Sequence, residues 1–300
     1  MDKQNPITAK EAIDSIESAV HTESNLRRAH ATGVAFDAIF HPTGAAIPWT
    51  SAAHLQKQEV SAVVRFSHSS TNSDPNEKLN PVKGMAVRFQ LPDNTYTNLT
   101  MVNVPIFISK TPEAFIRLIQ TFSSDSTWSQ RIDSLTHDVE YKAFGSILKK
   151  LKPFQNFETL HYYSIHAYFL KNSNQQRQAV RFEWQPLPQN DSDSDGDSME
   201  NELIHKIEKG QPIRFRLLIQ LAEHDDPTND PTIAWPDNRK KIEAGILTLK
   251  SLRTDNAESF VFDPTITIEG IECSDDPILL FRSSAYAESA KRRGVNNVDK

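Results

Sequence analysis

The sequence predicts an α+β protein in which helices flank an antiparallel, strongly curved sheet or β-barrel of about eight strands. Short β-rich segments separated by turn residues recur through the middle of the chain. Helical patterns are grouped at the two ends and in one central block. The chain has 300 residues, of which 38% are hydrophobic, so it is long enough to bury a large core.

Composition narrows the choice of partner and compartment. The net charge of −6 does not favour a nucleic-acid partner, and the one cysteine, Cys273, cannot form an intramolecular disulfide. The N-terminus lacks the basic start and apolar run of a signal peptide, and no window approaches the ~18 apolar residues of a membrane span. We therefore expect a cytoplasmic protein with no membrane span and no nucleic-acid partner.

The first part of the chain predicts one helix, three strands and a second helix. Residues 7–29 have apolar side chains at helical spacing, and Thr8 with Glu11 fits a capping box. Three β-rich runs follow, at 61–67, 85–89 and 102–108. A polar loop, 69–83, separates the first two runs. Pro112 fits the first turn of the helix that comes next.

The second part of the chain predicts a return to strands and then a closing helix. The segment 123–157 is mixed and partly helical in pattern. Four more strands and one short helix are predicted, at 161–170, 178–184, 213–221 and 244–251 and at 202–208. The closing helix is predicted over 276–294, with Pro277 in its first turn and Ser274 or Asp275 as its cap.

The closing helix carries a tyrosine between basic residues on one face. Arg282 and Tyr286 are four residues apart, and Arg293 is seven beyond Tyr286, so all three share a face. A guanidinium beside a phenol favours the phenolate, and tyrosine is a recognised axial ligand of haem iron. A surface helix with a half-buried tyrosine and scattered basic residues has the same pattern, so this helix alone leaves both interpretations open.

Several separated segments resemble the haem catalase family in matching order. Leu26-Arg-Arg-Ala-His-Ala-Thr-Gly resembles the distal-histidine motif of that family. The strands and helix that follow are matched by Val64-Arg-Phe-Ser, Gly84-Met-Ala-Val-Arg-Phe and Val104-Pro-Ile-Phe-Ile-Ser-Lys-Thr-Pro-Glu-Ala-Phe. The proximal segment is matched by Phe262-Asp-Pro-Thr, Gly270-Ile-Glu-Cys-Ser-Asp-Asp-Pro and Arg282-Ser-Ser-Ala-Tyr. The resemblance runs from about residue 22 to about 294 and implies a barrel of the catalase type.

The resemblance implies roles for four residues in peroxide chemistry on haem b. Tyr286 matches the axial ligand of the haem iron, and Arg282 matches the guanidinium that keeps this ligand ionised. His30 matches the distal histidine, which moves a proton from the near oxygen of a peroxide to the far one. Ser67 matches the hydroxyl that orients the histidine ring.

The resemblance also implies which residues would hold the porphyrin. Arg27, Arg65 and Arg293 match the arginines that pair with the haem propionates, as guanidinium groups do well. Phe115 matches the ring that stacks on the distal face of the porphyrin. Taken singly, a buried histidine or a surface arginine has an ordinary structural explanation, and the joint match in order and spacing is what favours the haem interpretation.

The sequence departs from catalases at the distal side. The position of the catalytic Asn falls on Val102, and Asn103 matches its neighbour, so that a shift of one residue would be needed to use Asn103. The Asp that guides peroxide has no counterpart in Asn80-Pro-Val-Lys-Gly84. The chain is also shorter than ordinary catalases, which indicates a small catalase-related peroxidase without the C-terminal helical domain.

The resemblance and these departures together predict the domain organisation and the function. We expect one domain over 1–300, with an N-terminal helix in 1–21, the barrel and its helical insertions in 22–260, and the proximal helix and tail in 261–300. It would reduce H2O2 or organic hydroperoxides with a small organic reductant, keep weak catalase activity, and occur as a monomer or homodimer. The alternatives are a haem-dependent fatty-acid hydroperoxide isomerase or lyase similar to allene oxide synthase, and a non-enzymatic haem- or calcium-binding protein.

One loop matches a calcium motif. Asp191, Asp193, Asp195 and Glu202, with Gly196 between them, fit the EF-hand loop letter for letter. However, Ser198 stands where a paired hand has an apolar residue, and a strand is predicted before the loop. A solvated Ser/Asp-rich surface loop explains the same letters, so both interpretations stay open.

Overall fold

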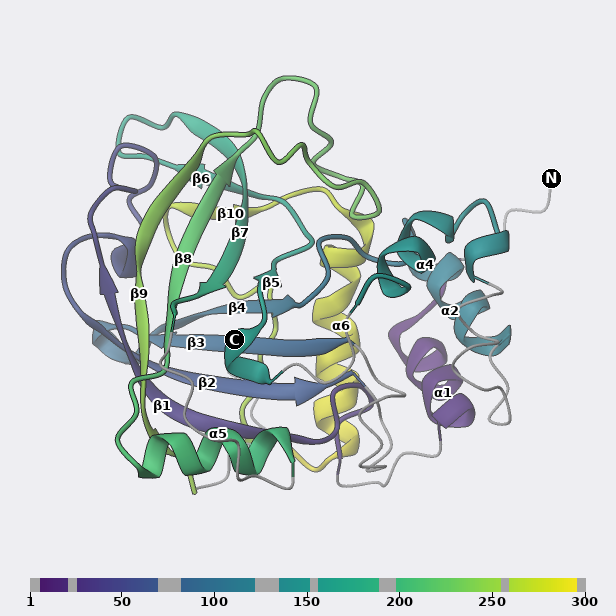
Figure 1. The fold of residues 1–300 in the computed structure, drawn as a ribbon. Helices are drawn as coiled ribbons and strands as arrows, with labels where there is room; N and C mark the ends of the chain where they lie inside the picture. The colour runs from purple at the N-terminus through teal and green to yellow at the C-terminus, as the bar shows by residue number, and fades with distance from the viewer. Residues whose placement is uncertain are drawn as a thin grey trace.

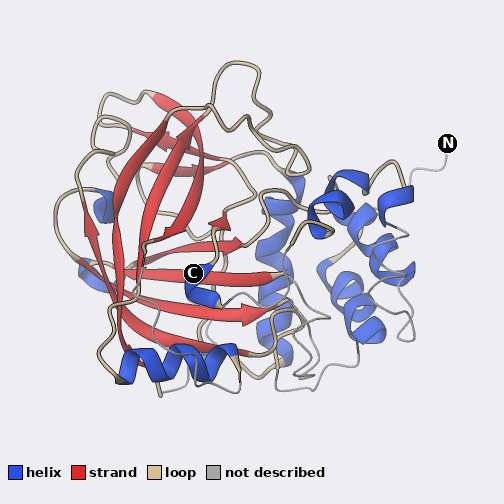
Figure 2. Ribbon diagram, in the orientation of Figure 1, coloured by secondary structure: helices blue, strands red, loops and turns tan. Residues whose placement is uncertain are grey.

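The computed structural model describes residues 6–20, 26–69, 82–121, 135–151, 156–188, 198–254 and 259–295. Its centre is a closed antiparallel β-barrel (Figures 1 and 2). The ring runs through β1 (Gly33–Pro42), β2 (Val60–His68), β3 (Lys83–Gln90), β4 (Tyr96–Val102), β5 (Tyr162–Tyr163), β7 (Arg177–Pro186), β8 (Arg214–Leu221) and β9 (Lys241–Leu252). The pairing of β7 with β8 closes it, and β6 (Tyr168–Lys171) with β10 (Ile271–Cys273) extends the sheet from β7. The predicted α+β barrel of about eight strands is therefore confirmed.

The core lies inside the barrel because alternate side chains of each strand point inward. On β1, β2 and β3 the inward residues include Phe36, Phe66 and Phe89, none of which is exposed. The ring of Phe40 meets those of Phe89 and Trp184 edge to face, with centroids 5.3 and 6.0 Å apart. The intervening residues of the same strands face outward, and this outward face carries the site described below.

The helices take two positions around the barrel (Figure 1). The long α6 (Pro277–Arg292) runs along the side of the barrel and contacts α1 (Ala9–Val20) and α2 (Pro112–Thr121), while α4 (Lys142–Leu148) shares a hydrophobic cluster with α2. The helix α5 (Met199–Glu208) lies across one end of the barrel and is capped by Ser198. Short 3-10 turns occur at Ala53–Leu55, Pro92–Asn94 and Phe157–Thr159. None of the described helices is both long and apolar enough to cross a bilayer.

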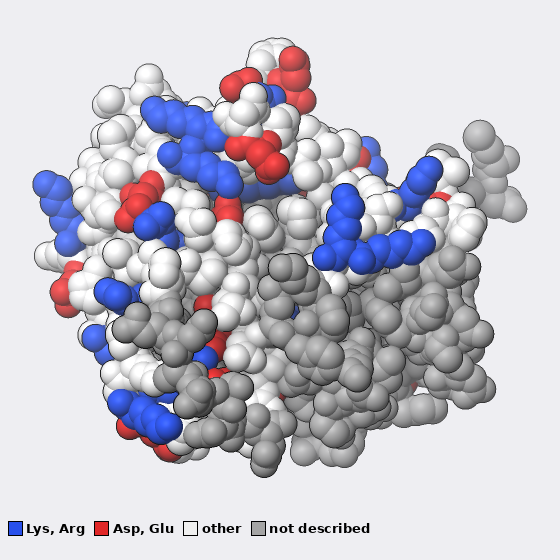
Figure 3. Space-filling view, viewed as in Figure 1, with Lys and Arg blue, Asp and Glu red and all other residues white. Residues whose placement is uncertain are grey.

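The charged surface is mixed. On the face drawn in Figure 3, lysine and arginine side chains lie among acidic ones in small groups, and the chain carries a net charge of −6. An even mixture of this kind gives no extended field of one sign that would attract a polyanion. The description applies to the coloured residues of that face.

Several predicted boundaries were wrong. The helix predicted over 7–29 is α1, Ala9–Val20, and residues 26–30 form bends instead; the Thr8–Glu11 capping box is present, with Thr8 N donating to Glu11 Oε2 over 2.8 Å. The strand β1 was missed. The strand predicted over 102–108 ends at Val102, because β4 occupies the polar-looking stretch before it. The strand predicted over 161–170 is divided into β5 and β6.

The cap of the closing helix was also assigned to the wrong residue. The N-cap is Asp276, neither Ser274 nor Asp275, and its carboxylate accepts from Ile278 N and Leu279 N over 2.8 and 3.3 Å. The physical reason is Pro277, which occupies the first helical position and so makes the residue directly before it the cap.

Candidate active site

The helix α6 holds Tyr286 and Arg282 as the sequence predicts. Nη2 of Arg282 donates to the hydroxyl oxygen of Tyr286 over 2.7 Å. Burial disfavours the charge of Arg282, but the neighbouring Tyr286 outweighs this and raises the pKa of the guanidinium. Arg282 is therefore cationic at every working pH, and a cationic donor of this kind stabilises negative charge on the oxygen that accepts from it.

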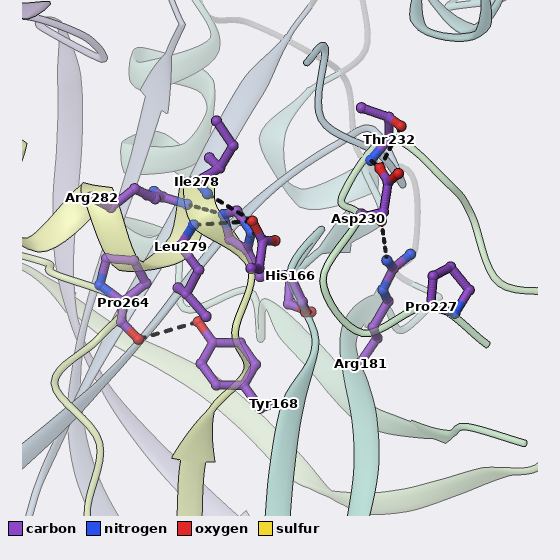
Figure 4. A network of polar contacts seen from close by, with 12 residues as sticks. His166, Tyr168, Arg181, Pro227, Asp230, Thr232, Pro264, Ile278, Leu279 and Arg282 are labelled. Carbon is purple, nitrogen blue, oxygen red and sulfur yellow. Dashed lines mark hydrogen bonds and ion pairs between the residues drawn. The ribbon is translucent and has the colours of Figure 1, made fainter. Parts of the chain in front are cut away.

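His166 and Asp276, which the sequence motifs do not predict, support Arg282 through hydrogen bonds. Nη1 of Arg282 lies 3.1 Å from Nε2 of His166, and Nδ1 of His166 lies 2.6 Å from Oδ2 of Asp276, as Figure 4 shows. Burial is the main influence on His166 and lowers its pKa in spite of Asp276, so the ring is neutral. A neutral ring that accepts from Arg282 at Nε2 must carry its hydrogen on Nδ1 and donate it to Asp276.

The backbone of His166 is set by a tight turn. His166 N donates to Ser164 O over 2.5 Å, and Ile165 between them has φ 54°, in the left-handed region that a β-branched residue rarely adopts. Ser164 fixes the turn from both sides, because its hydroxyl donates to His166 O and accepts from Phe182 N over 2.9 and 3.1 Å. This turn divides β5 from β6 and directs His166 toward α6.

On the other side of the site, His30 pairs with Ser67 as predicted. Nδ1 of His30 lies 2.9 Å from Oγ of Ser67, at the end of β2. Burial, followed by the charges of Arg65 and Arg282, lowers the pKa of His30 to about 3. The imidazole is therefore neutral at physiological pH.

The predicted Arg65 has a structural role beside His30. His30 itself has φ 57°, a left-handed backbone conformation. The guanidinium of Arg65 donates from Nη1 to His30 O and from Nη2 to Ala31 O, over 3.0 and 3.2 Å. Arg65 is 4% exposed, so these bonds are made away from bulk water and hold the turn that carries His30.

Gly84 provides the space for the His30 ring, and sequence reasoning matched it only as part of a strand. Gly84 pairs directly with Ser67 across β3 and β2. A Cβ atom on Gly84 would lie 2.8 Å from Nδ1 and Cε1 of His30 and 2.8 Å from Oγ of Ser67. Only glycine lets the imidazole lie this close to the strand.

The register of β4 decides between Val102 and Asn103. Val102 pairs with Gly84, so its side chain stands on the same outward face as Ser67 and His30. Asn103 faces the other way: its Oδ1 accepts from Lys83 N over 2.8 Å and its own N donates to Lys83 O over 3.0 Å. A one-residue shift would reverse every side chain of the strand, so Val102, and not Asn103, shares the outward face with Ser67.

Arg27, Arg293 and Phe115 are the other residues that the resemblance matches to porphyrin binding. Nη2 of Arg27 donates to Phe260 O over 2.9 Å, close to the segment that leads into α6. Arg293 is the C-cap of α6, about two turns beyond Tyr286. Phe115, on α2, packs against Phe107 with ring centroids 5.3 Å apart, and Phe107 in turn lies 6.4 Å from the ring of His166. Ring contacts therefore connect Phe115 through Phe107 to His166, whose Nε2 lies beside Arg282.

The donor set fits haem. A phenol oxygen backed by a permanent cation is suited to a ferric iron, and a buried neutral imidazole held across from it is suited to acid–base work above that iron. Buried arginines are suited to the two propionates. The imidazole lies against β3 at the position that a Cβ on Gly84 would crowd. Tyr286, Arg27, Arg65, Arg293 and Phe115 are the residues that would hold the group.

Of the four carboxylates in the calcium motif, Glu202 lies among the described residues. Glu202 is 3% exposed and pairs with Lys206 over 2.9 Å, and Lys206 also binds Glu158 over 2.6 Å. Its carboxylate is therefore engaged by a lysine within α5. Asp191, Asp193 and Asp195 lie outside the described residues. Among the described residues, no group of three or more His, Cys, Asp or Glu could hold a metal ion.

Comparisons with known proteins agree with this geometry. The model of the family Catalase matches residues 6–300. A "Catalase-related peroxidase" of Mycolicibacterium paratuberculosis is 31% identical over 97% of this chain and 96% of its own, and one of Synechococcus elongatus is 28% identical over 96% and 89%. A fungal catalase crystal structure has the same fold, with a TM-score of 0.74 at 18% identity over 91% of this chain and 60% of its own. The chain therefore belongs to the catalase family.

Proposed function

We propose that this protein is a haem-dependent peroxidase that reduces H2O2 or organic hydroperoxides with an organic electron donor and keeps only weak catalase activity. The observation that carries the proposal is Val102 beside a neutral, buried His30. The two relatives named "Catalase-related peroxidase", which match the chain over nearly its whole length, support the same assignment.

The proposed chemistry assigns a proton transfer to His30. When bound, haem would supply the redox centre that cleaves the O–O bond. His30 is neutral and its Nδ1 is engaged by Ser67, so Nε2 is the nitrogen that can take a proton from the near oxygen of the peroxide. The same nitrogen returns that proton to the far oxygen, which leaves as water or as an alcohol.

The residues of α6 act from the opposite side. Tyr286 would be the axial ligand, and Arg282 donates to its oxygen. His166 accepts from Arg282 and donates to Asp276, so each donor in the chain has a fixed acceptor. Second-shell partners of this kind orient a ligand and set its basicity. This chain of contacts would therefore stabilise the negative charge of an ionised Tyr286 oxygen, the form that binds iron.

Val102 favours peroxidase over catalase turnover. A catalase reaction needs a second H2O2, which must be hydrogen-bonded in position before it is oxidised. A valine side chain has no hydrogen-bonding group, and Asn103 is engaged by Lys83 on the other face of β4. A larger organic donor does not need to enter this position, because electrons can reach the haem edge from outside it.

The experiment is a parallel measurement on the purified holoprotein. The oxidation of an aromatic dye donor is followed by absorbance while oxygen release is followed with an electrode. We expect donor oxidation with little oxygen. Oxygen release near the diffusional ceiling, ~10⁸–10⁹ M⁻¹s⁻¹ in kcat/KM, with negligible donor oxidation would contradict the proposal.

A further inference from the structure

We propose that Glu17 of α1 is a positioning residue for haem, because it holds the sequence neighbours of Arg27 and Arg293, two of the arginines matched to the propionates. The inference rests on the proposed function, since it assumes that these two arginines bind a haem. It goes beyond that function by giving the N-terminal helix a part in haem retention.

Two of the arginines matched to the propionates each stand beside a second arginine in the sequence. Arg27 and Arg28 follow α1, and Arg292 and Arg293 lie at the end of α6. Glu17 binds one member of each pair: its Oε1 accepts from Nε of Arg28 over 2.5 Å, and its Oε2 accepts from Nη1 of Arg292 over 2.6 Å. A single carboxylate therefore joins the segment after α1 to the end of α6.

The side chain of Arg292 is held by three carboxylates. Besides Glu17, Asp14 of α1 accepts from Nη2 over 2.7 Å, and Glu288 of α6 accepts from Nε over 2.8 Å. All three nitrogens of the guanidinium are thus engaged. Consecutive residues of an α-helix point about 100° apart. Holding Arg292 against α1 therefore also sets the direction in which Arg293 leaves the helix.

Arg28 and Arg27 point to different partners in the same way. Besides its contact with α1, Arg28 donates from Nη1 to Leu26 O over 2.6 Å, and its side chain is 6% exposed. Nη2 of Arg27 donates instead to Phe260 O over 2.9 Å, and its guanidinium lies 5.8 Å from the centre of the Phe262 ring. In each pair, one arginine binds α1 and the other is the one matched to a propionate.

The acidic side chains around these arginines also separate their charges. Guanidinium groups that lie close together repel one another and compete for the same anion. Asp14, Glu17 and Glu288 offset the charges of Arg28 and Arg292. The haem propionates would therefore pair with the arginines matched to them rather than with their neighbours.

The helix α1 connects two helices that carry residues matched to haem binding. It packs against both α2, which bears Phe115, and α6, which bears Tyr286. Ile13 of α1 is 3% exposed, and Ile7 N donates to Oε1 of Glu113 on α2 over 3.3 Å. Figure 1 shows α1 beside α2 at the side of the barrel. Glu17 thus belongs to an element that is fixed to both helices.

The test measures how fast haem leaves the ferric holoprotein when excess apomyoglobin captures it, followed by Soret absorbance. It is run with haem and with haem dimethyl ester, whose esterified propionates carry no charge. In Glu17→Gln we expect haem to leave at least about tenfold faster, since a hydrogen bond between charged groups contributes about that factor. The dimethyl ester should leave at nearly the unchanged rate. Arg292→Lys keeps the charge, loses the contacts of the planar guanidinium and should show the same selective effect.

The matched control is Glu272→Gln. Glu272 also joins two cations, Arg177 over 2.8 Å and Lys171 over 3.6 Å, but it lies on β10, away from the arginine pairs in the sequence. Both dissociation rates should stay unchanged in this variant. Asp14→Asn removes a contact to Arg292 alone and should raise the haem rate by a smaller factor than Glu17→Gln.

The outcomes separate the two proposals. If haem and its dimethyl ester leave faster by the same factor in Glu17→Gln and Arg292→Lys, or if neither rate changes, the inference is overturned. Donor oxidation by the haem-loaded protein would then still leave the proposed function standing. A selective effect on haem in a protein that oxidises no donor would uphold the inference and overturn the proposed function. A protein that takes up no haem would overturn both.

Discussion

Gly84 is important because it has no side chain. The imidazole of His30 and the hydroxyl of Ser67 both lie where a Cβ on Gly84 would have to be. A contact at 2.8 Å is far inside the normal carbon–nitrogen separation, so one of the two partners must move if a methyl group is added. His30 is the more mobile of the two, because it lies on a bend while Ser67 belongs to a paired strand.

We therefore predict that Gly84→Ala displaces the His30 ring. The rate of peroxide cleavage should fall by ~100-fold or more, which is the usual contribution of a positioned acid–base group, while haem binding and the Soret band remain. The companion variant Ser67→Ala removes one hydrogen bond and adds no bulk, so its loss should be no more than about tenfold. Stopped-flow kinetics measure both, and a Gly84→Ala protein that cleaves peroxide at the unchanged rate would show that the ring is not held by this contact.

The sequence could predict the residues of the site that belong to short motifs. The structure contains the hydrogen-bonded pairs His30–Ser67 and Arg282–Tyr286 that the motifs imply, and the roles of these residues toward haem stay predictions. His166 could not be predicted, because its partner Asp276 is 110 positions away in the chain. The sequence predicts one continuous strand over 161–170 and gives no signal of the turn at Ile165 that orients His166.

At the scale of a helix, the N-cap residue of α6, Asp276, both caps the helix and binds the ring of His166. One oxygen of Asp276 caps the helix by accepting from Ile278 N and Leu279 N, and the other binds His166. The cap fixes the first turn of α6, and the same side chain fixes the ring that supports Arg282. The position of the helix and the orientation of its catalytic face are therefore set together.

Replacing this cap should affect both stability and the haem environment. Asp276→Ala loses an N-cap worth ~1 kcal/mol and leaves the buried Nδ1–H of His166 without an acceptor, which costs a further ~1–3 kcal/mol. We expect a lower unfolding free energy in urea together with a shifted Soret spectrum. The matched control is Ser198→Ala at the N-cap of α5, which should cost ~1 kcal/mol and leave the spectrum unchanged. An unshifted spectrum in Asp276→Ala would mean that the His166 contact has no influence on Tyr286.

Strand boundaries were predictable only where side chains alternate clearly. Tyr96–Val102 carries polar residues on its outward face, and these bind the backbone of the segment that leads to α6: Thr100 Oγ1 donates to Phe262 O over 2.8 Å. A strand whose outer face is covered by another segment has no simple alternation of apolar and solvent-facing residues. The strand β1, which pairs with β2 and β9, was also missed.

At the scale of the whole molecule, burial strongly shifts the pKa of two histidines, His30 and His54. Burial lowers the pKa of His30 and of His54 to about 3 in each case; for His30 the nearby arginines add to this. His54 lies inside the barrel with its ring stacked on Phe89 at 4.6 Å. Both groups bind protons in the unfolded chain near their ordinary pKa of about 6.5 and resist protonation in the folded one.

The lowered pKa values of His30 and His54 determine how the free energy of unfolding changes with pH. The contribution of His30 and His54 to the free energy of unfolding is complete above about pH 6.5. It is lost as the pH falls toward about 3, because the unfolded chain then binds more protons than the folded protein. Each histidine should contribute a slope of about 1.4 kcal/mol per pH unit within that window. Urea unfolding at several pH values should show a shallower slope in His54→Gln than in the unchanged protein. His224→Gln is the control, because His224 is 99% exposed, and an equal slope in all three proteins would contradict the assignment.

We propose that α6 supplies a phenolate ligand from Tyr286 to a haem that faces a neutral His30. The most direct measurement is the absorption spectrum of the purified holoprotein, recorded across pH and repeated for Tyr286→Phe. We predict a high-spin ferric spectrum that stays unchanged between about pH 5 and 9, because neither His30 nor Arg282 titrates in that range. Tyr286→Phe should lose haem or shift the spectrum. Haem retained with an unaltered spectrum in that variant would contradict the account.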